Sequence, residues 1–448
     1  MSETLIDRLK KKGEPEFKKL FAERASKDAQ GRVIADTYAT KEEVEASKTL
    51  RILGVTGLGG SSKVLTRTYD AVGKDWSKID NGQVIEFSSP LDGFFKFTED
   101  TDSEGNVFIW IPSFSFRKDQ VTPDGEIVAY SVKHSDDKDE EEGFERHPFF
   151  YNYVNEVKRD PVPGRWVAKY KTGFDNNANP TKLTSKSGTQ YYQVSKNFGD
   201  YVSLAKASSK VDGDYNICNW MFASLMRLLI PVYFGRLDLF DVLKNDGHVN
   251  GYDMKSQSGS TSSIQSVCGI NKVTCSNKIF GFEDLISGIP ELQTGIYMDW
   301  SSGKLCYSNL FEANSANDES YIQSDIDVEA RGSDSMTNVI TKVSTDSNNW
   351  FLSLPTASAG PLGEAEVEYD NEGDGGTGDA YRRYYCSKYY LYGDTTYPKA
   401  RSIFMAFGSY YYGMYYGVWP SLGLWSLEAV SPSAAYVIWA ARLCKRPE

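Results

Sequence analysis

The segment GNVFIWIPSFSF, residues 105–116, carries a run of large apolar side chains followed, beyond Pro112, by an alternation of serine and phenylalanine. Short apolar runs and period-two alternation between glycines and prolines are typical of β-strands. Three neighbouring segments share this pattern: GQVIEFSSP (82–90), GFFKFTED (93–100) and GEIVAYSVKH (125–134). We therefore expect short strands joined by turns throughout this part of the chain.

One long helix is predicted in the middle of the chain, within DYNICNWMFASLMRLLIPVYF, residues 214–234. Its apolar side chains recur at helical spacing and form a broad face. We expect the helix to end at Pro231, because proline lacks the N–H that an interior helical residue donates. The residues assigned to the apolar face are Trp220, Ala223, Leu225, Leu228 and Leu229.

The N-terminal region is predicted to be helical and polar. Thr40 and Glu43 have the spacing of a capping box, and the apolar stripe that follows is thin. A helix with so narrow a stripe usually packs against a partner or against its own copies. The glycine-rich segment 54–62 marks the first boundary. We expect a helical attachment or oligomerisation segment over 1–53, a linker with the first strands over 54–84, and one large domain over 85–448.

Composition excludes several classes of protein. Hydrophobic residues make up 40% of the chain and charged residues 25%, which fits a folded protein with a sizeable core. The net charge of −12 argues against nucleic-acid binding, which depends on neutralising phosphates. No apolar run approaches the roughly 18 residues of a membrane span, and the charged N-terminus lacks a signal-peptide core. We expect synthesis in a cytoplasm and no membrane insertion.

The sequence offers little catalytic or metal-binding chemistry. Its six cysteines are scattered without a CxxC pair, which predicts buried free thiols and no zinc site. His134, His147 and His248 lie far apart, so we expect structural or solvated roles for them. Residues 100–111 begin like a calcium loop, but Ile111 occupies the position of the bidentate glutamate, so a hairpin turn explains them better. The acidic run 136–143 is interpreted as a solvated loop. No metal and no cofactor is expected.

Tyrosines gather near the C-terminus. Residues 381–448 hold 13 of the chain's 29 tyrosines, and GSYYYGMYYGVWPSLGLW, residues 408–425, is the densest part. Neighbouring strand residues point to opposite faces, so at least half of the tyrosines at 410–416 should face outward or line a groove. Tyrosine offers large, rigid contact area at low entropic cost, as in binding surfaces drawn from diverse repertoires. The alternative is a tyrosine-rich sheet packed against another subunit.

Three segments, in this order, resemble a known family. They are residues 105–116 together with 131–150, then IFGFEDLISGIPELQTGIYMD (279–299), and finally GLWSLEAVSPSAAYVIWAARLCKRPE (423–448). The family consists of phage-encoded proteins with the version of the C-type-lectin fold that formylglycine-generating enzymes share. Its central motif is matched by Gly281, Glu283, Asp284, Leu285 and Gly288, and its closing motif by Ala441, Arg442 and Leu443. The chain departs from the family at Pro290, Leu292 and Ala440.

The resemblance implies an α+β, C-type-lectin-like fold with short antiparallel strands, about two core helices and long loops, preceded by the N-terminal helical segment. In such proteins the terminal strand-loop-strand is diversified by retroelements and binds receptors at the phage tail tip. The enzymes of the family use two closely spaced C-terminal cysteines, whereas Cys386 has no near partner, so we do not expect an enzyme.

The leading hypothesis is therefore a phage tail-tip receptor-binding protein, located in the virion and made in the cytoplasm of the host bacterium. It would bind a bacterial cell-surface glycan or protein, contact other tail proteins through its N-terminus, and form a homo-oligomer, with a trimer favoured. The alternative is a virion structural fibre protein whose aromatic tail makes subunit contacts; an oxidase of the formylglycine type or a polysaccharide depolymerase is less favoured. The expected ligand-binding residues, within the variable-type region 381–448, are Tyr384, Tyr389, Tyr410, Tyr411, Tyr412, Met414, Tyr415, Tyr416, Trp419, Leu422, Trp425, Val430, Tyr436 and Trp439.

Overall fold

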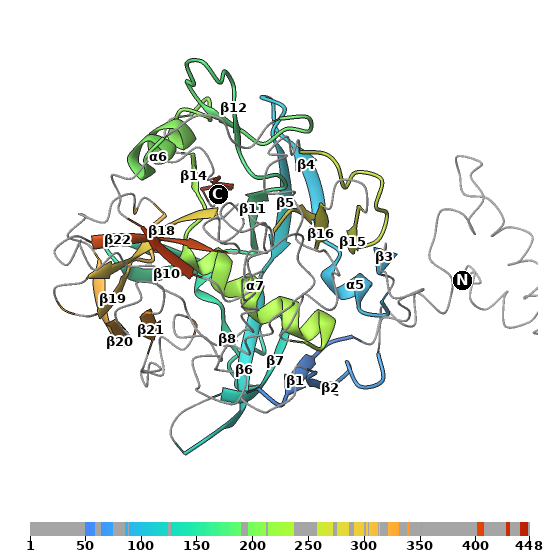
Figure 1. Cartoon of the computed structure of the whole chain (residues 1–448). Helices are drawn as coiled ribbons and strands as arrows, with labels where there is room; N and C mark the ends of the chain where they lie inside the picture. The colour runs from blue at the N-terminus through green and yellow to red at the C-terminus, as the bar shows by residue number, and fades with distance from the viewer. Residues whose placement is uncertain are drawn as a thin grey trace, which may run out of the picture. The chain divides into compact units, whose positions relative to one another are not determined.

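The segment 105–116 supplies one strand to each of two sheets in the computed structural model (Figure 1). β5 (Val107–Pro112) belongs to a five-stranded antiparallel sheet, and β6 (Phe114–Val121) to a second five-stranded sheet. Ser113 joins them, and its N–H donates to the carbonyl of Pro163 at 2.8 Å. The strands predicted within 105–116 and 125–134 are confirmed, and β6 continues beyond the first segment to Val121.

The first sheet has the order β14-β24-β11-β5-β4, and the second the order β2-β1-β7-β6-β8. Their other strands are β4 (Thr98–Thr101), β11 (Gly164–Ala168), β14 (Tyr215–Ile217), β24 (Leu443–Lys445), β1 (Leu53–Thr56), β2 (Thr66–Tyr69), β7 (Ile127–His134) and β8 (Glu145–Arg146). The C-terminal strand β24 thus lies inside a sheet, between β14 and β11. Figure 1 shows the C-terminal end of the chain beside these two strands.

A six-stranded sheet has the order β21-β20-β19-β18-β22-β23, and a four-stranded sheet the order β17-β16-β15-β3. Their strands are β18 (Glu291–Asp299), β19 (Lys304–Tyr307), β20 (Ile322–Ala330), β21 (Asn338–Ile340), β22 (Arg401–Ala406), β23 (Leu427–Val430), β3 (Glu86–Phe87), β15 (Cys268–Ile270), β16 (Asn277–Ile279) and β17 (Phe282–Glu283). Two hairpins complete the set: β9 (Tyr151–Val154) with β10 (Val157–Pro161), and β12 (Gly173–Phe174) with β13 (Leu183–Thr184).

The structure describes residues 50–58, 64–74, 86–87, 89–123, 127–189, 196–211, 214–236, 258–271, 276–285, 291–299, 302, 304–311, 313, 321–330, 338–340, 351, 401–406, 427–430 and 440–446. All of them except Leu50 belong to one unit, Arg51–Glu448. The helical segment predicted over 1–53 lies almost entirely outside these residues. The predicted division of the chain into three parts therefore stays a prediction.

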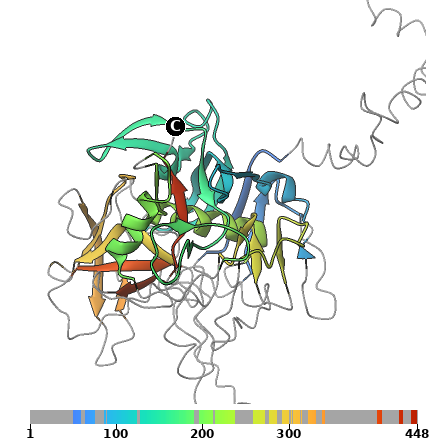
Figure 2. The same cartoon turned by 90° about the horizontal axis from the view of Figure 1, so that it is seen from above.

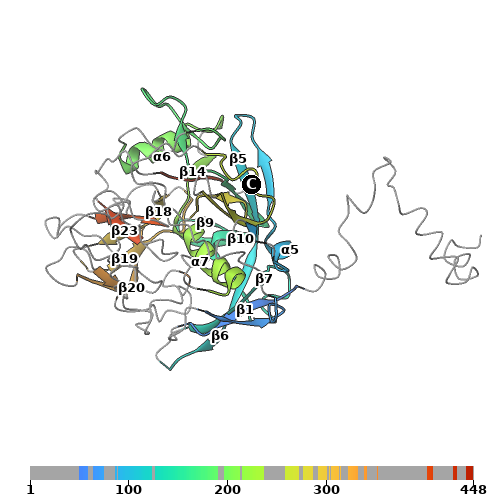
Figure 3. The same ribbon diagram turned by 45° about the vertical axis from the view of Figure 1, so that its right-hand side comes forward.

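The long helix α7 (Trp220–Phe234) packs against β1, β18 and the short η1 turn (Pro148–Phe150). Figure 2 and Figure 3 show it between the six-stranded sheet and the sheet that contains β1. Every residue of α7 is buried, so the predicted apolar face is only part of its contact surface. A helix that is buried on all sides belongs to the interior of the fold.

The predicted end of this helix at Pro231 is wrong. The helix continues through Pro231 and ends at Gly235, whose φ of 63° is left-handed and whose N–H donates to the carbonyl of Pro231 at 2.8 Å. An interior proline costs about 3 kcal/mol or more of helix stability. Val232, Tyr233 and Phe234 are nonetheless buried in the last turn, and their burial outweighs that cost.

The expected strand over 93–100 forms only in its second half. A helical turn, α5 (Asp92–Phe95), precedes β4. Phe94 and Phe95 are both buried, and consecutive strand residues cannot both face the same core. Phe95 stacks on Phe280 with ring centroids 4.7 Å apart. The remaining described α-helix is α6 (Phe198–Lys206), which begins with a capping box formed by Asn197 and Asp200.

The described chain is mostly β with few helices, and the expected α+β class is confirmed at that level. Its sheets are antiparallel, as predicted. Among the described helices, none is long and apolar enough to cross a membrane.

Candidate functional site

Almost all of the expected ligand-binding residues lie outside the described part of the chain. The exception is Val430, the last residue of β23, of which the backbone is described. The prediction that the tyrosines at 410–416 face outward therefore stays a prediction. What the structure does describe is the frame that holds both ends of this region.

The tyrosine-rich segment lies between two paired strands. β22 ends at Ala406, β23 begins at Leu427, and these two residues face each other in the antiparallel ladder. β22 also pairs with β18, where Ala406 is opposite Glu291. The described residues on either side of 407–426 therefore lie at neighbouring positions of the six-stranded sheet.

The far end of the region returns to the same place. Ala440 forms a parallel bridge with Glu291, and the carbonyl of Ala440 accepts a hydrogen bond from Leu292 N–H at 2.9 Å. Glu291 is thus bridged by Ala406 before the region 407–439 and by Ala440 after it. The backbone of one residue holds both ends of most of the predicted binding region.

The side chain of Glu291 is buried in an ion pair with Arg442. The Nη2 of Arg442 lies 2.7 Å from Oε1 of Glu291, and its Nε lies 3.2 Å from both carboxylate oxygens. Neither side chain is exposed to solvent. The remaining Arg442 donors bind the carbonyls of Ala168 at 3.0 Å, Lys169 at 2.6 Å and Glu283 at 3.0 Å. All five guanidinium N–H groups have acceptors in this arrangement.

Three further charged residues surround this ion pair. The Nζ of Lys171 lies 3.7 Å from Glu291 Oε1, and both side chains are fully buried. The carboxylate of Glu283 accepts hydrogen bonds from Gly259 N–H, Thr261 N–H and the Thr261 hydroxyl, at 2.7, 2.9 and 2.6 Å. Asp284, the next residue in the sequence, is also buried.

Burial and the neighbouring charge of Glu283 raise the pKa of Asp284 to about 7, despite the opposing effect of Lys171. Its carboxylate accepts hydrogen bonds from Asn277 N–H at 3.1 Å and the Ser276 hydroxyl at 3.3 Å. Burial also lowers the pKa of Lys171, to about 8. The centre therefore contains two groups that titrate near neutral pH.

This buried charge centre joins two of the segments that carry the family resemblance. Arg442 of the closing motif donates to the carbonyl of Glu283 of the central motif. Gly281, in the same central motif, has a φ of +90° and lies against Ile109 of β5. The sequence reasoning selected Arg442 and Glu283 but missed Glu291. A buried arginine requires a carboxylate partner, yet the sequence holds 61 acidic residues and does not show which one it is.

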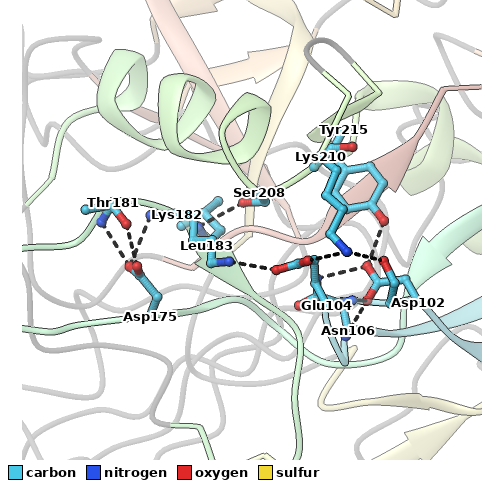
Figure 4. Close-up of polar contacts among 12 residues, drawn as sticks. Asp102, Glu104, Asn106, Asp175, Thr181, Lys182, Leu183, Ser208, Lys210 and Tyr215 are labelled. Carbon is cyan, nitrogen blue, oxygen red and sulfur yellow. Dashed lines mark hydrogen bonds and ion pairs between the residues drawn. The ribbon is translucent and has the colours of Figure 1, made fainter.

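A second polar cluster lies at the β4–β5 turn (Figure 4). The Oδ1 of Asp102 accepts from Glu104 N–H and Asn106 N–H, each at 2.8 Å. Its Oδ2 accepts from Asn106 Nδ2 at 3.0 Å and from the Tyr215 hydroxyl at 2.7 Å. Burial opposes ionisation of Asp102, but these hydrogen bonds outweigh it and lower its pKa. The predicted hairpin turn is confirmed, and both carboxylate oxygens of Asp102 accept hydrogen bonds from protein donors.

Most of the acidic run 136–143 is exposed, as expected of a solvated loop, but Asp139 is buried. The run closes over Lys133, whose side chain is 1% exposed. The Nζ of Lys133 lies 2.6 Å from Asp136, 2.9 Å from Asp139 and 2.8 Å from Glu142. β7 is buried continuously from Ala129 to Lys133, and the acidic residues that follow supply the counter-charges of this lysine.

The described histidines have structural contacts. His147 is fully buried, and its Nδ1 accepts from Phe149 N–H at 3.2 Å. Its Nε2 must then carry the proton and donate to the Ser224 hydroxyl, 3.1 Å away, which in turn donates to the carbonyl of Phe351 at 2.7 Å. A base that activates a serine would need the opposite direction of donation. The Nε2 of His134 lies 3.1 Å from the carbonyl of Phe94, and His248 lies outside the described residues.

The prediction of buried free thiols is confirmed for the cysteines that the structure describes, which are Cys218, Cys268, Cys306 and Cys444. Within the described ranges, no three histidine, cysteine or carboxylate side chains gather as a metal site. No protein-family model matches the chain, and no curated protein has a similar sequence.

Proposed function

We propose that this chain is a phage receptor-binding protein that contacts a bacterial surface through residues 381–448. The observation that carries the proposal is the frame at Glu291, which is bridged by Ala406 on one side and by Ala440 on the other. A segment whose ends are fixed in a sheet can present side chains without contributing to the core. Function is commonly located on such loops over a rigid scaffold.

The composition of the framed segment supports a binding role. Tyrosine and tryptophan next to glycine and serine provide contact area with little loss of side-chain entropy. Aromatic faces stack on sugar rings, and the hydroxyl groups of tyrosine bind polar groups on glycans or proteins. The proposed ligand is therefore a bacterial cell-surface glycan or protein.

The C-type-lectin-like fold is part of this proposal. It is supported by the contact between Arg442 and the carbonyl of Glu283, which brings together the two segments with the resemblance. In the proposed assembly, residues 1–53 attach the chain to other tail proteins, and several copies act together in a homo-oligomer, with a trimer favoured. Weak contacts in several copies raise the overall affinity without new contacts.

The test is a triple variant with Tyr411→Ala, Tyr415→Ala and Trp419→Ala. The matched control is Val72→Ala, Val157→Ala and Val211→Ala, three apolar side chains that are more than half exposed elsewhere on the described surface. Binding of purified full-length protein to bacterial cells is measured with a panel of species. We expect the first variant to lose cell binding and the control to retain it, both with the urea midpoint of wild type.

Unchanged cell binding by the folded tyrosine variant would overturn the site. The molar mass of each protein in solution distinguishes the proposed receptor-binding function from the alternative of a structural fibre protein. If the tyrosine variant changes from an oligomer to a monomer while cell binding per chain persists, the aromatic segment is a subunit contact of a structural fibre protein.

A further inference from the structure

Two buried cysteines lie diagonally across the terminal strand pair. β14 and β24 pair with Asn216 opposite Cys444 and Ile217 opposite Leu443. The pairing extends to Cys218, whose N–H donates to the carbonyl of Arg442 at 2.8 Å. Cys218 and Cys444 are therefore diagonal neighbours, and because alternate strand residues share a face, their side chains lie on the same side of the sheet.

Each thiol affects the pKa of the other. The Sγ of Cys218 lies 3.8 Å from the carbonyl oxygen of Leu443, and the Sγ of Cys444 lies 3.6 Å from that of Lys445. Cys218 is fully buried and Cys444 is 3% exposed. The other two described cysteines have no cysteine among these neighbours. The Cys268 thiol contacts the Tyr233 hydroxyl, and the Cys306 Sγ lies 4.0 Å from the carbonyl of Lys304.

We propose that Cys218 and Cys444 form a reversible disulfide that clamps β24 to β14 in oxidising surroundings. Diagonal neighbours have Cα atoms about 7–8 Å apart, whereas a disulfide usually joins Cα atoms about 4.4–6.8 Å apart. Closing the bond therefore requires a small shift of β24 toward β14. β24 lies inside the sheet and Leu443 and Cys444 are buried, so the exchange takes place in molecules in which this strand has opened locally.

Cys444 is the attacking group. The hydrogen bond from Cys218, followed by the positive charge of Arg165, lowers the pKa of the Cys444 thiol even though burial opposes this. The oxidant is a low-molecular-weight disulfide such as glutathione disulfide. The Cys444 thiolate attacks one of its sulfurs, the oxidant's S–S bond breaks, and one glutathione thiolate leaves and takes up the proton that Cys444 released.

Cys218 completes the exchange. Burial raises the pKa of its thiol, so it stays protonated until β24 opens. Its sulfur then attacks the Cys444 sulfur of the mixed disulfide and loses its proton, and the second glutathione leaves as a thiol. Two protein thiols are oxidised to one disulfide, and one oxidant disulfide is reduced to two thiols.

The clamp would act on the buried charge centre, because Arg442 is the residue opposite Cys218 in this pair of strands. A disulfide there would keep Arg442 beside Glu291 and, through Ala440, would hold the end of the region 407–439. The proposal rests on the strand pairing alone, so it stands whether or not that region binds a ligand.

The test uses the purified full chain, reduced and then incubated with glutathione disulfide. We expect the intact mass to fall by that of two hydrogen atoms, peptide mapping to link Cys218 to Cys444, and the urea midpoint to rise; dithiothreitol should reverse all three. Cys444→Ser should abolish the linked peptide and the change in midpoint. Cys268→Ser is the matched control and should retain both.

A linked peptide that is absent, a stable glutathione adduct on Cys444, or a disulfide between two chains would each overturn the clamp. Should Cys444→Ser fail to fold, wild type alone decides the question. Oxidised wild type is unfolded and treated with an alkylating reagent, in one sample before reduction and in another sample after it. Cys218 and Cys444 must be protected from alkylation before reduction and labelled after it.

Discussion

Arg442 and Glu291 are 151 residues apart in the sequence, and their fully buried side chains form an ion pair with an Nη2 to Oε1 distance of 2.7 Å. A buried ion pair contributes little net stability compared with apolar residues of the same shape, but removing one partner leaves an uncompensated buried charge. The pair connects the terminal strand to the first residue of β18. The integrity of this centre therefore depends on both partners being present.

Arg442→Met should destabilise the protein by about 3–5 kcal/mol, the usual cost of breaking a buried pair. Part of the loss comes from the three backbone carbonyls that Arg442 binds. The double variant with Glu291→Leu should lose much less than the sum of the two single variants, because it leaves no unpaired carboxylate. Urea denaturation of the four proteins measures this coupling, and additive single effects would contradict it.

The strands around residues 105–116 could be predicted because their signal is local: apolar runs bounded by glycine and proline. The existence of α7 could be predicted for the same reason, from its helical periodicity. Its end could not, because the burial of Tyr233 and Phe234 outweighs the local preference of Pro231. Local patterns report propensity, and tertiary packing overrides it.

The candidate site was less predictable, since its contacts are long-range. Arg442 could be selected from the closing motif, but Glu291 is one carboxylate among many, at the start of a strand of mixed polarity. Lys133 is the opposite case, because its partners are close to it in the sequence and were still not predicted. Three acidic residues close in sequence cover it, yet their sequence alone resembles an ordinary solvated loop.

Asp284→Asn should flatten the pH dependence of stability between about pH 4 and 7. The pKa of Asp284 is raised to about 7 in the folded protein, so the folded state keeps a proton that the unfolded chain loses above about pH 4. The stabilisation that this group contributes is fully present below about pH 4 and is lost as the pH rises toward 7. Asparagine keeps the acceptor oxygen and tolerates the φ of 51° at this position.

The measurement is the difference in free energy of unfolding between wild type and Asp284→Asn at several pH values. Groups that do not interact with Asp284, such as His134 with its lowered pKa, cancel in this difference. The free energy of unfolding of wild type should increase relative to that of the variant as the pH is lowered from 7 to 5. A difference that stays constant with pH would show that Asp284 ionises normally.

Lys133→Met should destabilise the protein by about 1–3 kcal/mol. The expected loss lies between the values for exposed and for fully buried pairs, because the Asp136 side chain is 39% exposed and that of Glu142 is 22% exposed, so water screens part of their repulsion. Lys138→Met is the matched control, since Lys138 is an exposed lysine of the same acidic run. Urea denaturation should show a change of about 0.5 kcal/mol or less for this control. Equal losses in the two variants would refute a special role for Lys133.

Tyr215→Phe should cost about 1.5–3 kcal/mol, the usual contribution of a hydrogen bond to a charged group. Its hydroxyl donates to Asp102 at 2.7 Å, and Tyr215 is 8% exposed. Glu104→Gln, in the same cluster, is the control: its lysine partners Lys182 and Lys210 are 32% and 67% exposed, and exposed pairs contribute about 1 kcal/mol or less. Thermal and urea unfolding should rank the two variants in this order. The reverse order would mean that the surface lysines, and not the buried hydroxyl, hold the β4–β5 turn in place.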